Sequence, residues 1–179
     1  SDKQQPSTIH QGPGMSNSRE FIPLNIAVLT VSDSRSEEND RSGQLLAERV
    51  VKAGHKLAAK TIVRDDIYQI RATLSNWIAQ PEINAIVTTG GTGVTGRDGT
   101  PEAIQPLLDK EIEGFGEIFR MLSYEEIKTS SLQSRALAGV ANATYIFCLP
   151  GSSGACATGW DKVIQDQLDH RTAPCNLAM

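Results

Sequence analysis

A loop rich in glycine and threonine, residues 88–100, has the composition of a phosphate-binding site. It follows a short apolar run, residues 85–87, which predicts a buried strand, and it leads to Thr100-Pro101, a pair that favours the start of a helix. Glycines at the end of a strand let the backbone approach a ligand, so that N–H groups and hydroxyls converge on phosphate oxygens. Arg97 and Asp98 lie at the far end, where they could neutralise an anion and hold a metal ion or a proton.

The same loop contains the spacing of two other nucleotide-binding motifs, and both fit poorly. Gly91, Gly93 and Gly96 match the dinucleotide fingerprint, but that motif places its last glycine in the opening turn of a helix, and here we expect the helix only at Pro101. A P-loop requires Lys and then Ser or Thr after its last glycine, where this chain has Arg97 and Asp98. A purely structural glycine turn is an open alternative.

Apolar runs and helical stripes alternate along the chain. They predict strands at 24–31, 56–63 and 85–89, and helices at 42–53 and 67–78. After the glycine loop we expect a short helix to about residue 110, an amphipathic helix at 114–127, a hairpin of 137–141 and 144–149, and a final helix around 160–168. This order predicts an α/β fold, a three-layer α/β/α domain with a mostly parallel, mixed sheet.

In such a sheet, ligands bind beyond the carboxyl ends of the strands. Four segments are expected at that edge: residues 32–40, the acidic pair Asp65-Asp66, the glycine loop, and a second glycine loop at 150–154. We therefore expect these four segments to form one site.

Composition excludes several classes of function. The chain has 179 residues, of which 39% are apolar, enough for one globular domain. A net charge of -4 and a pI near 5.4 argue against nucleic acid as a partner. There is no apolar run of membrane-spanning length and no signal-peptide core, which argues against a membrane partner. Three cysteines without C-x-x-C spacing suit a reducing compartment, so we expect a cytoplasmic protein.

The first fourteen residues are polar and rich in Gln, Ser and Pro. They are interpreted as an expression remnant or a disordered arm, and the single domain is expected to span residues 15–179.

Several motifs in this order resemble one known family. They are Thr-Val-Ser-Asp at 30–33, Asp65, Thr-Gly-Gly-Thr-Gly at 89–93 with Arg97-Asp98 and Thr-Pro-Glu-Ala at 100–103, Gly-Phe-Gly-Glu at 114–117, Ser134-Arg135, and Leu-Pro-Gly-Ser at 149–152. Together they resemble the molybdenum cofactor biosynthesis proteins MoaB and MogA, whose domain recurs in plant Cnx and animal gephyrin. The resemblance extends from residue 21 to the end. Residues 119–127, 132–136 and 171–176 resemble the MoaB branch most closely.

The resemblance implies a MoaB/MogA-like fold and a reaction. In that reaction the terminal phosphate of molybdopterin attacks the α-phosphorus of Mg-ATP, and pyrophosphate leaves. In-line displacement at phosphorus needs positioning and charge stabilisation more than a protein nucleophile. Backbone amides of residues 90–93 could hold phosphates, and carboxylates could hold Mg²⁺ with several of its waters retained. ATP, Mg²⁺ and molybdopterin are therefore the implied ligands.

Carried over by resemblance, the catalytic and metal-binding residues are Asp65 and Asp98. The implied substrate- and nucleotide-binding residues are Thr89, Gly90, Gly91, Thr92, Gly93, Arg97, Ser134, Arg135, Pro150, Gly151, Ser152 and Ser153. Ser152 and Ser153 are well placed at a helix start for the pterin phosphate.

Each of these assignments has a structural alternative. Asp98 could serve only a turn or a helix cap, and Asp66 could be the family carboxylate in place of Asp65. Arg97 could form a surface ion pair, and Asp33 could simply end the first strand.

Two other functions compete with the transferase. The first is a MoaB-branch protein that binds molybdopterin without adenylyltransferase activity; retention of Asp65-Asp66 and of Arg97-Asp98 favours the enzyme. The second is a clustering scaffold like the gephyrin domain, which no linker or repeat supports.

We also expect a homo-oligomer. Phe115, Phe119, Met121 and Tyr124 give the 114–127 helix more aromatic and apolar surface than one face of a lone helix readily buries. The resemblance supplies the number: a trimer, or a hexamer of two trimers.

Overall fold

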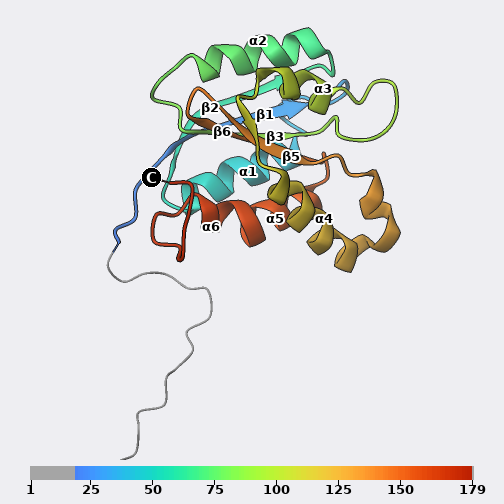
Figure 1. Cartoon of the computed structure of the whole chain (residues 1–179). Helices are drawn as coiled ribbons and strands as arrows, with labels where there is room; N and C mark the ends of the chain where they lie inside the picture. The colour runs from blue at the N-terminus through green and yellow to red at the C-terminus, as the bar shows by residue number, and fades with distance from the viewer. Residues whose placement is uncertain (1–18, 179) are drawn as a thin grey trace, which may run out of the picture.

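The computed structural model describes residues 19–178, in which a six-stranded sheet lies between two layers of helices (Figure 1). The expected arm at 1–14 lies outside the described residues. The strands are β1 (Asn25–Val31), β2 (Lys56–Val63), β3 (Ala85–Thr89), β4 (Lys110–Glu111), β5 (Leu137–Ala141) and β6 (Thr144–Leu149). The main helices are α1 (Arg41–Lys52), α2 (Ile67–Ile78), α3 (Thr100–Ile104), α4 (Glu113–Ile127) and α5 (Ser153–Gly159).

The sheet is mixed, in the order β2-β1-β3-β6-β5-β4. The first four strands of that order run parallel, and β5 and β4 pair antiparallel. The register sets Thr30 of β1 opposite Thr89 of β3, and Thr89 opposite Leu149 of β6. Three carboxyl ends therefore meet side by side, and the expected three-layer α/β fold is confirmed.

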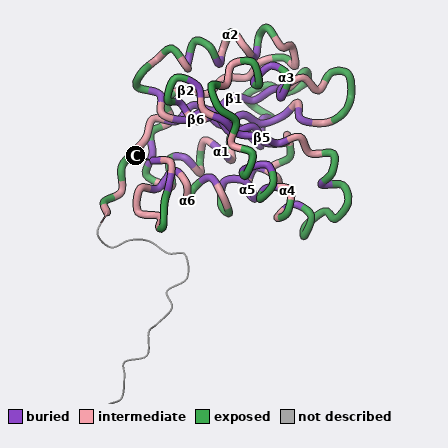
Figure 2. Tube along the Cα trace, viewed as in Figure 1, coloured by how far each residue is buried: buried purple, intermediate pink, exposed green. Residues whose placement is uncertain are grey.

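Each face of the sheet packs on its own set of helices because alternate residues of a strand point to opposite faces. Ile26 and Val28 of β1 contact the core beneath α1, α4 and α5, whereas Ala27 and Leu29 contact the core beneath α2 and α3. Figure 2 shows the sheet as the buried centre of the molecule, with exposed residues on the outer sides of the helices. Among residues 19–178, no helix is long and apolar enough to cross a membrane.

Strands β2, β3, β5 and β6 have the predicted bounds, but two helices differ from expectation. The helix after Pro101 is a single turn, continued by a 3-10 turn at Gln105–Leu107, and Lys110 lies in edge strand β4. Thr100 does not cap this helix, because its hydroxyl donates to the Gly90 carbonyl at 2.8 Å. The final helix is three joined pieces: α5, a π turn at Trp160–Ile164 and α6 (Gln165–Gln167).

The large apolar side chains of α4 are partly in the core and partly exposed to solvent. Phe115 and Phe119 are buried against the sheet, so the expectation that they add to an exposed aromatic surface is wrong. Met121 and Tyr124 are exposed at 60% and 52%. The outer side of this helix therefore keeps an apolar surface that the domain itself does not cover.

A fully buried carboxylate fastens α1 to the sheet. Asp40, the residue before α1, accepts hydrogen bonds from the Gly43 amide at 3.0 Å and from the Thr30 hydroxyl at 2.7 Å. Lys60 of β2 places its Nζ 3.6 Å from the same carboxylate. Asp66 caps α2 in the simpler manner, accepting from the Tyr68 and Gln69 amides while partly exposed.

The two caps give a matched prediction. Asp40→Ala should lower the free energy of unfolding by about 2–4 kcal/mol, because it leaves buried donors and a lysine without their acceptor. Asp66→Ala should cost only about 1 kcal/mol, the usual value of an exposed N-cap. Urea denaturation at one fixed protein concentration measures both, and equal losses would contradict the buried-network interpretation.

Candidate functional site

The glycine loop leaves β3 through two residues with left-handed backbone. Gly90 has φ 102° and Gly91 has φ 70°, conformations that favour glycine. A Cβ on Gly90 would lie 2.2 Å from the Val31 carbonyl oxygen, and one on Gly91 would lie 2.2 Å from the Thr100 hydroxyl. The loop thus passes directly against the end of β1, where any other residue would collide with backbone.

Hydrogen bonds join this loop to the second glycine loop. The Gly90 amide donates to the Leu149 carbonyl at 3.0 Å, and the Thr89 hydroxyl donates to the Pro150 carbonyl at 2.8 Å. Gly151 lies against Gly90, and a Cβ on Gly151 would be in van der Waals contact with the Gly90 Cα at 3.4 Å. The two loops expected at one sheet edge are therefore in contact.

A polar cavity of about 380 Å³ opens where these loops meet β1. Five of the residues expected at the site line it: Thr89, Gly90, Gly91, Gly151 and Ser152. Ser152 caps α5, its hydroxyl oxygen accepting from the Ala155 amide at 3.1 Å. The hydroxyl hydrogen of Ser152 is free to donate to a ligand oxygen.

Asp65 and Asp66, adjacent in sequence, have different roles. Asp66 caps α2, whereas Asp65 accepts from the Gly99 amide at 3.1 Å and lies against Gly91. Burial raises the pKa of the Asp65 carboxyl, and the negative charges of Asp98 and Asp33 raise it further, against the lowering effect of the Gly99 bond. Of the two acids, Asp65 is therefore the one built into the glycine loop.

Asp98 shapes the loop from within. Its Oδ2 accepts from the Thr95 hydroxyl at 2.6 Å and from the Thr95 amide at 3.0 Å, and the hydroxyl bond is the main reason that the pKa of Asp98 is lowered. A Cβ on Gly93 would lie 2.6 Å from that same oxygen. Asp98 therefore stabilises a turn, as its structural alternative predicted, and its carboxylate also lies against Gly93 of the loop.

Arg97 forms an ion pair, which was the structural alternative considered for this residue. Its guanidinium donates to both oxygens of Asp33, with contacts of 2.8 to 3.0 Å. The Arg97 hydrogen bonds hold the pKa of the Asp33 carboxyl below its usual value. Asp33 also accepts from the Asp65 amide at 3.1 Å, so it does more than end β1.

Arg135 holds the glycine loop from its other side. Its backbone N–H donates to the Thr92 carbonyl at 3.3 Å, and its side chain donates to the carbonyls of Gly93 and Asp98, each at 2.8 Å, and to the Glu102 carboxylate. Ser134 has a buried hydroxyl without a hydrogen-bond partner among residues 19–178. The structure thus gives Arg135 a positioning contact that the sequence could not assign.

A second cavity, of about 490 Å³, is lined by the later part of the loop. Its lining includes Asp98, Gly99, Glu102 and Arg135, with an apolar wall from Ile67 and Val94. The loop therefore lines two cavities, a hydroxyl-rich one at residues 89–91 and one at residues 94–99 that contains a site acid. Ser153 lines neither cavity; it lies in the first turn of α5.

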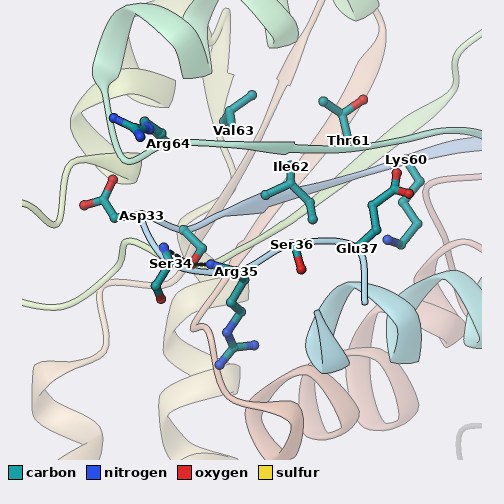
Figure 3. A pocket seen from close by; sticks show the side chains of 11 residues that line it. Asp33, Ser34, Arg35, Ser36, Glu37, Lys60, Thr61, Ile62, Val63 and Arg64 are labelled. Carbon is teal, nitrogen blue, oxygen red and sulfur yellow. Dashed lines mark hydrogen bonds between the residues drawn. The ribbon is translucent and has the colours of Figure 1, made fainter. Parts of the chain in front are cut away.

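Six residues that line the first cavity were not named from the sequence as site residues, although three of them lie in the 32–40 segment expected at this edge: Thr30, Val31, Ser32, Ser34, Arg35 and Ser42. Arg35 also lines an adjoining cavity of about 580 Å³, between residues 32–37 and β2, shown in Figure 3. The available signal was positional, since residues just beyond a parallel strand lie at the binding edge. No group of three or more His, Cys, Asp or Glu side chains within residues 19–178 is arranged to hold a metal ion.

Comparisons with known proteins agree with this geometry. Residues 27–170 match the family model described as a probable molybdopterin binding domain. Molybdenum cofactor biosynthesis protein B of Escherichia coli strain K12 is 57% identical over 159 residues, covering 89% of this chain and 94% of that protein.

Solved structures agree as well. One titled molybdenum cofactor biosynthesis protein B is 43% identical with a TM-score of 0.81, covering 84% of this chain and 94% of the other. The tungsten cofactor synthesizing protein MoaB from Pyrococcus furiosus is 38% identical with a TM-score of 0.74, covering 80% and 92%. The chain therefore belongs to the MoaB/MogA family of molybdenum cofactor biosynthesis proteins.

Proposed function

We propose that this protein adenylylates molybdopterin. An oxygen of the pterin's terminal phosphate attacks the α-phosphorus of ATP, the new P–O bond forms as the α–β P–O bond breaks, and pyrophosphate leaves. One observation carries the proposal: two acids from different segments, Asp65 and Asp98, both lie against the backbone of a strand-end glycine loop.

The chain supplies positioning rather than a nucleophile. Backbone N–H groups of the glycine loop and the hydroxyl of Ser152 would bind phosphate oxygens and align attacking and leaving groups. Cys156 is the thiol nearest these groups, its Sγ 3.2 Å from the Thr89 hydroxyl. Burial raises the pKa of Cys156 to about 11, so it stays protonated and takes no covalent part.

The acids suit a magnesium ion. Mg²⁺ prefers carboxylate oxygens and is commonly held by one or two of them with waters and substrate phosphates. The charges of Asp98 and Asp33 help to raise the pKa of Asp65, so a cation there would relieve an existing repulsion. When bound, Mg²⁺ would neutralise charge on the phosphates. We propose Asp65 and Asp98 as its protein ligands.

The catalytic role of Asp65 and Asp98 can be tested with Asp66 as the control. Asp98→Asn and Asp65→Asn should each lower kcat for ATP- and Mg²⁺-dependent formation of adenylylated molybdopterin by about 100-fold or more, because each removes a charged contact to the metal. Asp66→Asn should keep near wild-type turnover, since an asparagine still caps α2. The measurement is product formation at saturating Mg²⁺.

Wild-type turnover in Asp98→Asn would refute its catalytic role. If the wild-type protein binds molybdopterin without turnover, the alternative holds: a binding protein of the MoaB branch that lacks transferase activity.

A stability measurement separates lost catalysis from lost folding. The pKa of Asp65 is raised in the folded protein, so its ionised form costs stability above that pKa, and the cost disappears as the pH falls towards the unfolded value near 3.8. Asp65→Asn should therefore be as stable as wild type at pH 7, or more stable by up to about 1 kcal/mol. The advantage should shrink between pH 7 and pH 4 in urea titrations, and a clear loss of stability at pH 7 would contradict this account.

We also propose a homo-oligomer, a trimer or a hexamer. The supporting surface is the outer side of α4 and the following turn, where Ile118, Met121, Tyr124, Ile127 and Leu132 are exposed. Light scattering behind a sizing column should give three or six times the 19.3 kDa chain mass. Met121→Glu should shift the mass downwards, because it places a charge in an apolar contact. A wild-type mass near that of one chain would refute the oligomer.

A further inference from the structure

We propose that Arg35 is the cation that binds substrate phosphate in the cavity between the two glycine loops. This inference rests on the proposed function for the identity of the substrate, a phosphate monoester, although phosphate binding itself can be tested alone. Arg35 lies within residues 32–40, which were expected at this edge, but it was not named as a site residue; Arg97 was expected to offset phosphate charge.

A phosphate in this cavity would need a cation to compensate its charge, and the lining offers one. Its walls are backbone and hydroxyl groups from β1, β3, the two glycine loops and the start of α1, and Arg35 is the one charged side chain among them. Hydroxyls and amides satisfy phosphate oxygens, but they leave the charge of the anion uncompensated. A guanidinium offers a planar fork of N–H donors that matches two phosphate oxygens.

The loop after β1 directs Arg35 towards this cavity. Figure 3 shows the side chains of Asp33 and Arg35 pointing to different sides of the loop. The Arg35 Nη1 donates to the Ser42 hydroxyl at 3.3 Å, and the Ser42 hydroxyl lies 3.5 Å from the buried carboxylate of Asp40. The Asp40 cluster that holds α1 to the sheet therefore also positions this guanidinium.

Arg35 lacks the ion pairs that occupy Arg97 and Lys60. Within residues 19–178, Arg35 has no carboxylate oxygen within ion-pair distance, whereas Arg97 is paired with both oxygens of Asp33 and Lys60 is paired with Asp40. Using Arg97 for phosphate would break a two-point ion pair next to Asp65. Arg35 can bind an anion by exchanging a single bond to a neutral hydroxyl.

The position of Arg35 also says how a substrate would extend. Arg35 lines both the cavity at the glycine loops and the larger cavity along β2. A phosphate held at the first can therefore carry its organic part into the second. A bulky phosphate monoester fits this arrangement better than free inorganic phosphate does, because it fills both spaces.

The test is a ³¹P NMR titration of the full-length protein with inorganic phosphate. Wild type should bind phosphate saturably, and Arg35→Gln should weaken the affinity at least about tenfold, the loss expected for a charge-assisted contact. Arg35→Lys should recover part of it. Arg64→Gln is the matched control: Arg64 is exposed, lines only the β2 cavity, and its replacement changes the net charge equally. It should bind like wild type.

Three results would overturn the proposal: no saturable binding by wild type, equal affinity in Arg35→Gln, or a loss confined to Arg97→Gln. Adenylylation assays separate the two claims. If phosphate binding behaves as expected and no adenylylated product forms, only the proposed reaction fails. If product forms with an unchanged KM for molybdopterin in Arg35→Gln, only the role of Arg35 fails.

Discussion

The close approach of β1 to the glycine loop is the constraint on which the site depends. Gly90 passes so near the Val31 carbonyl that a Cβ would lie 2.2 Å from it, and its φ of 102° turns the chain away from the line of β3. That turn brings the next glycine against Asp65 and Thr100. An alanine at Gly90 would force β1 and β3 apart at their carboxyl ends, and every distance in the site would change with them.

The acidic groups show how this constraint makes neighbours of distant segments. Asp33 follows β1, Asp65 follows β2 and Asp98 lies in the loop after β3, and the charges of Asp33 and Asp98 raise the pKa of Asp65. Arg97, held on Asp33, offsets part of this repulsion, and the charges of Arg64 and Arg135 help to lower the pKa of Asp33 and of Asp98 respectively. Without a further cation the cluster keeps an excess of negative charge, which the fold tolerates because the group is partly open to water.

The sequence predicted the strands well because their signal is local. Buried parallel strands are apolar runs bounded by polar or glycine-rich loops, and β3 and β6 have the predicted bounds for that reason. The helix after Pro101 was predicted too long because tertiary pairing decides its end: Lys110 joins β5 through the ladder. Thr100 was expected to cap the helix that begins at Pro101, but its hydroxyl donates instead to the Gly90 carbonyl, a contact that exists only in the folded loop.

For the site, too, the sequence predicted what local patterns and topology decide, but not what tertiary contacts decide. Its location followed from topology, and so did the contact between the two glycine loops. The sequence could not separate Asp65 from Asp66, because both follow β2 and only the path of the loop shows which one meets Gly99. It also favoured Arg97 over Arg35, since Arg97 lies in the motif, while the competing partner Asp33 is 64 residues away.

The two cavities along the glycine loop differ in charge, and this difference indicates which ligand each can bind. One contains hydroxyls and a single cation, Arg35, and suits an incoming anion. The other contains the Asp98 carboxylate, which can attract a cation, while Glu102 is paired with Arg135. Two anionic substrates repel each other, so a transfer between them needs positive charge near both phosphates. If Mg²⁺ binds Asp65 and Asp98 as proposed, the ion and Arg35 together would supply that positive charge.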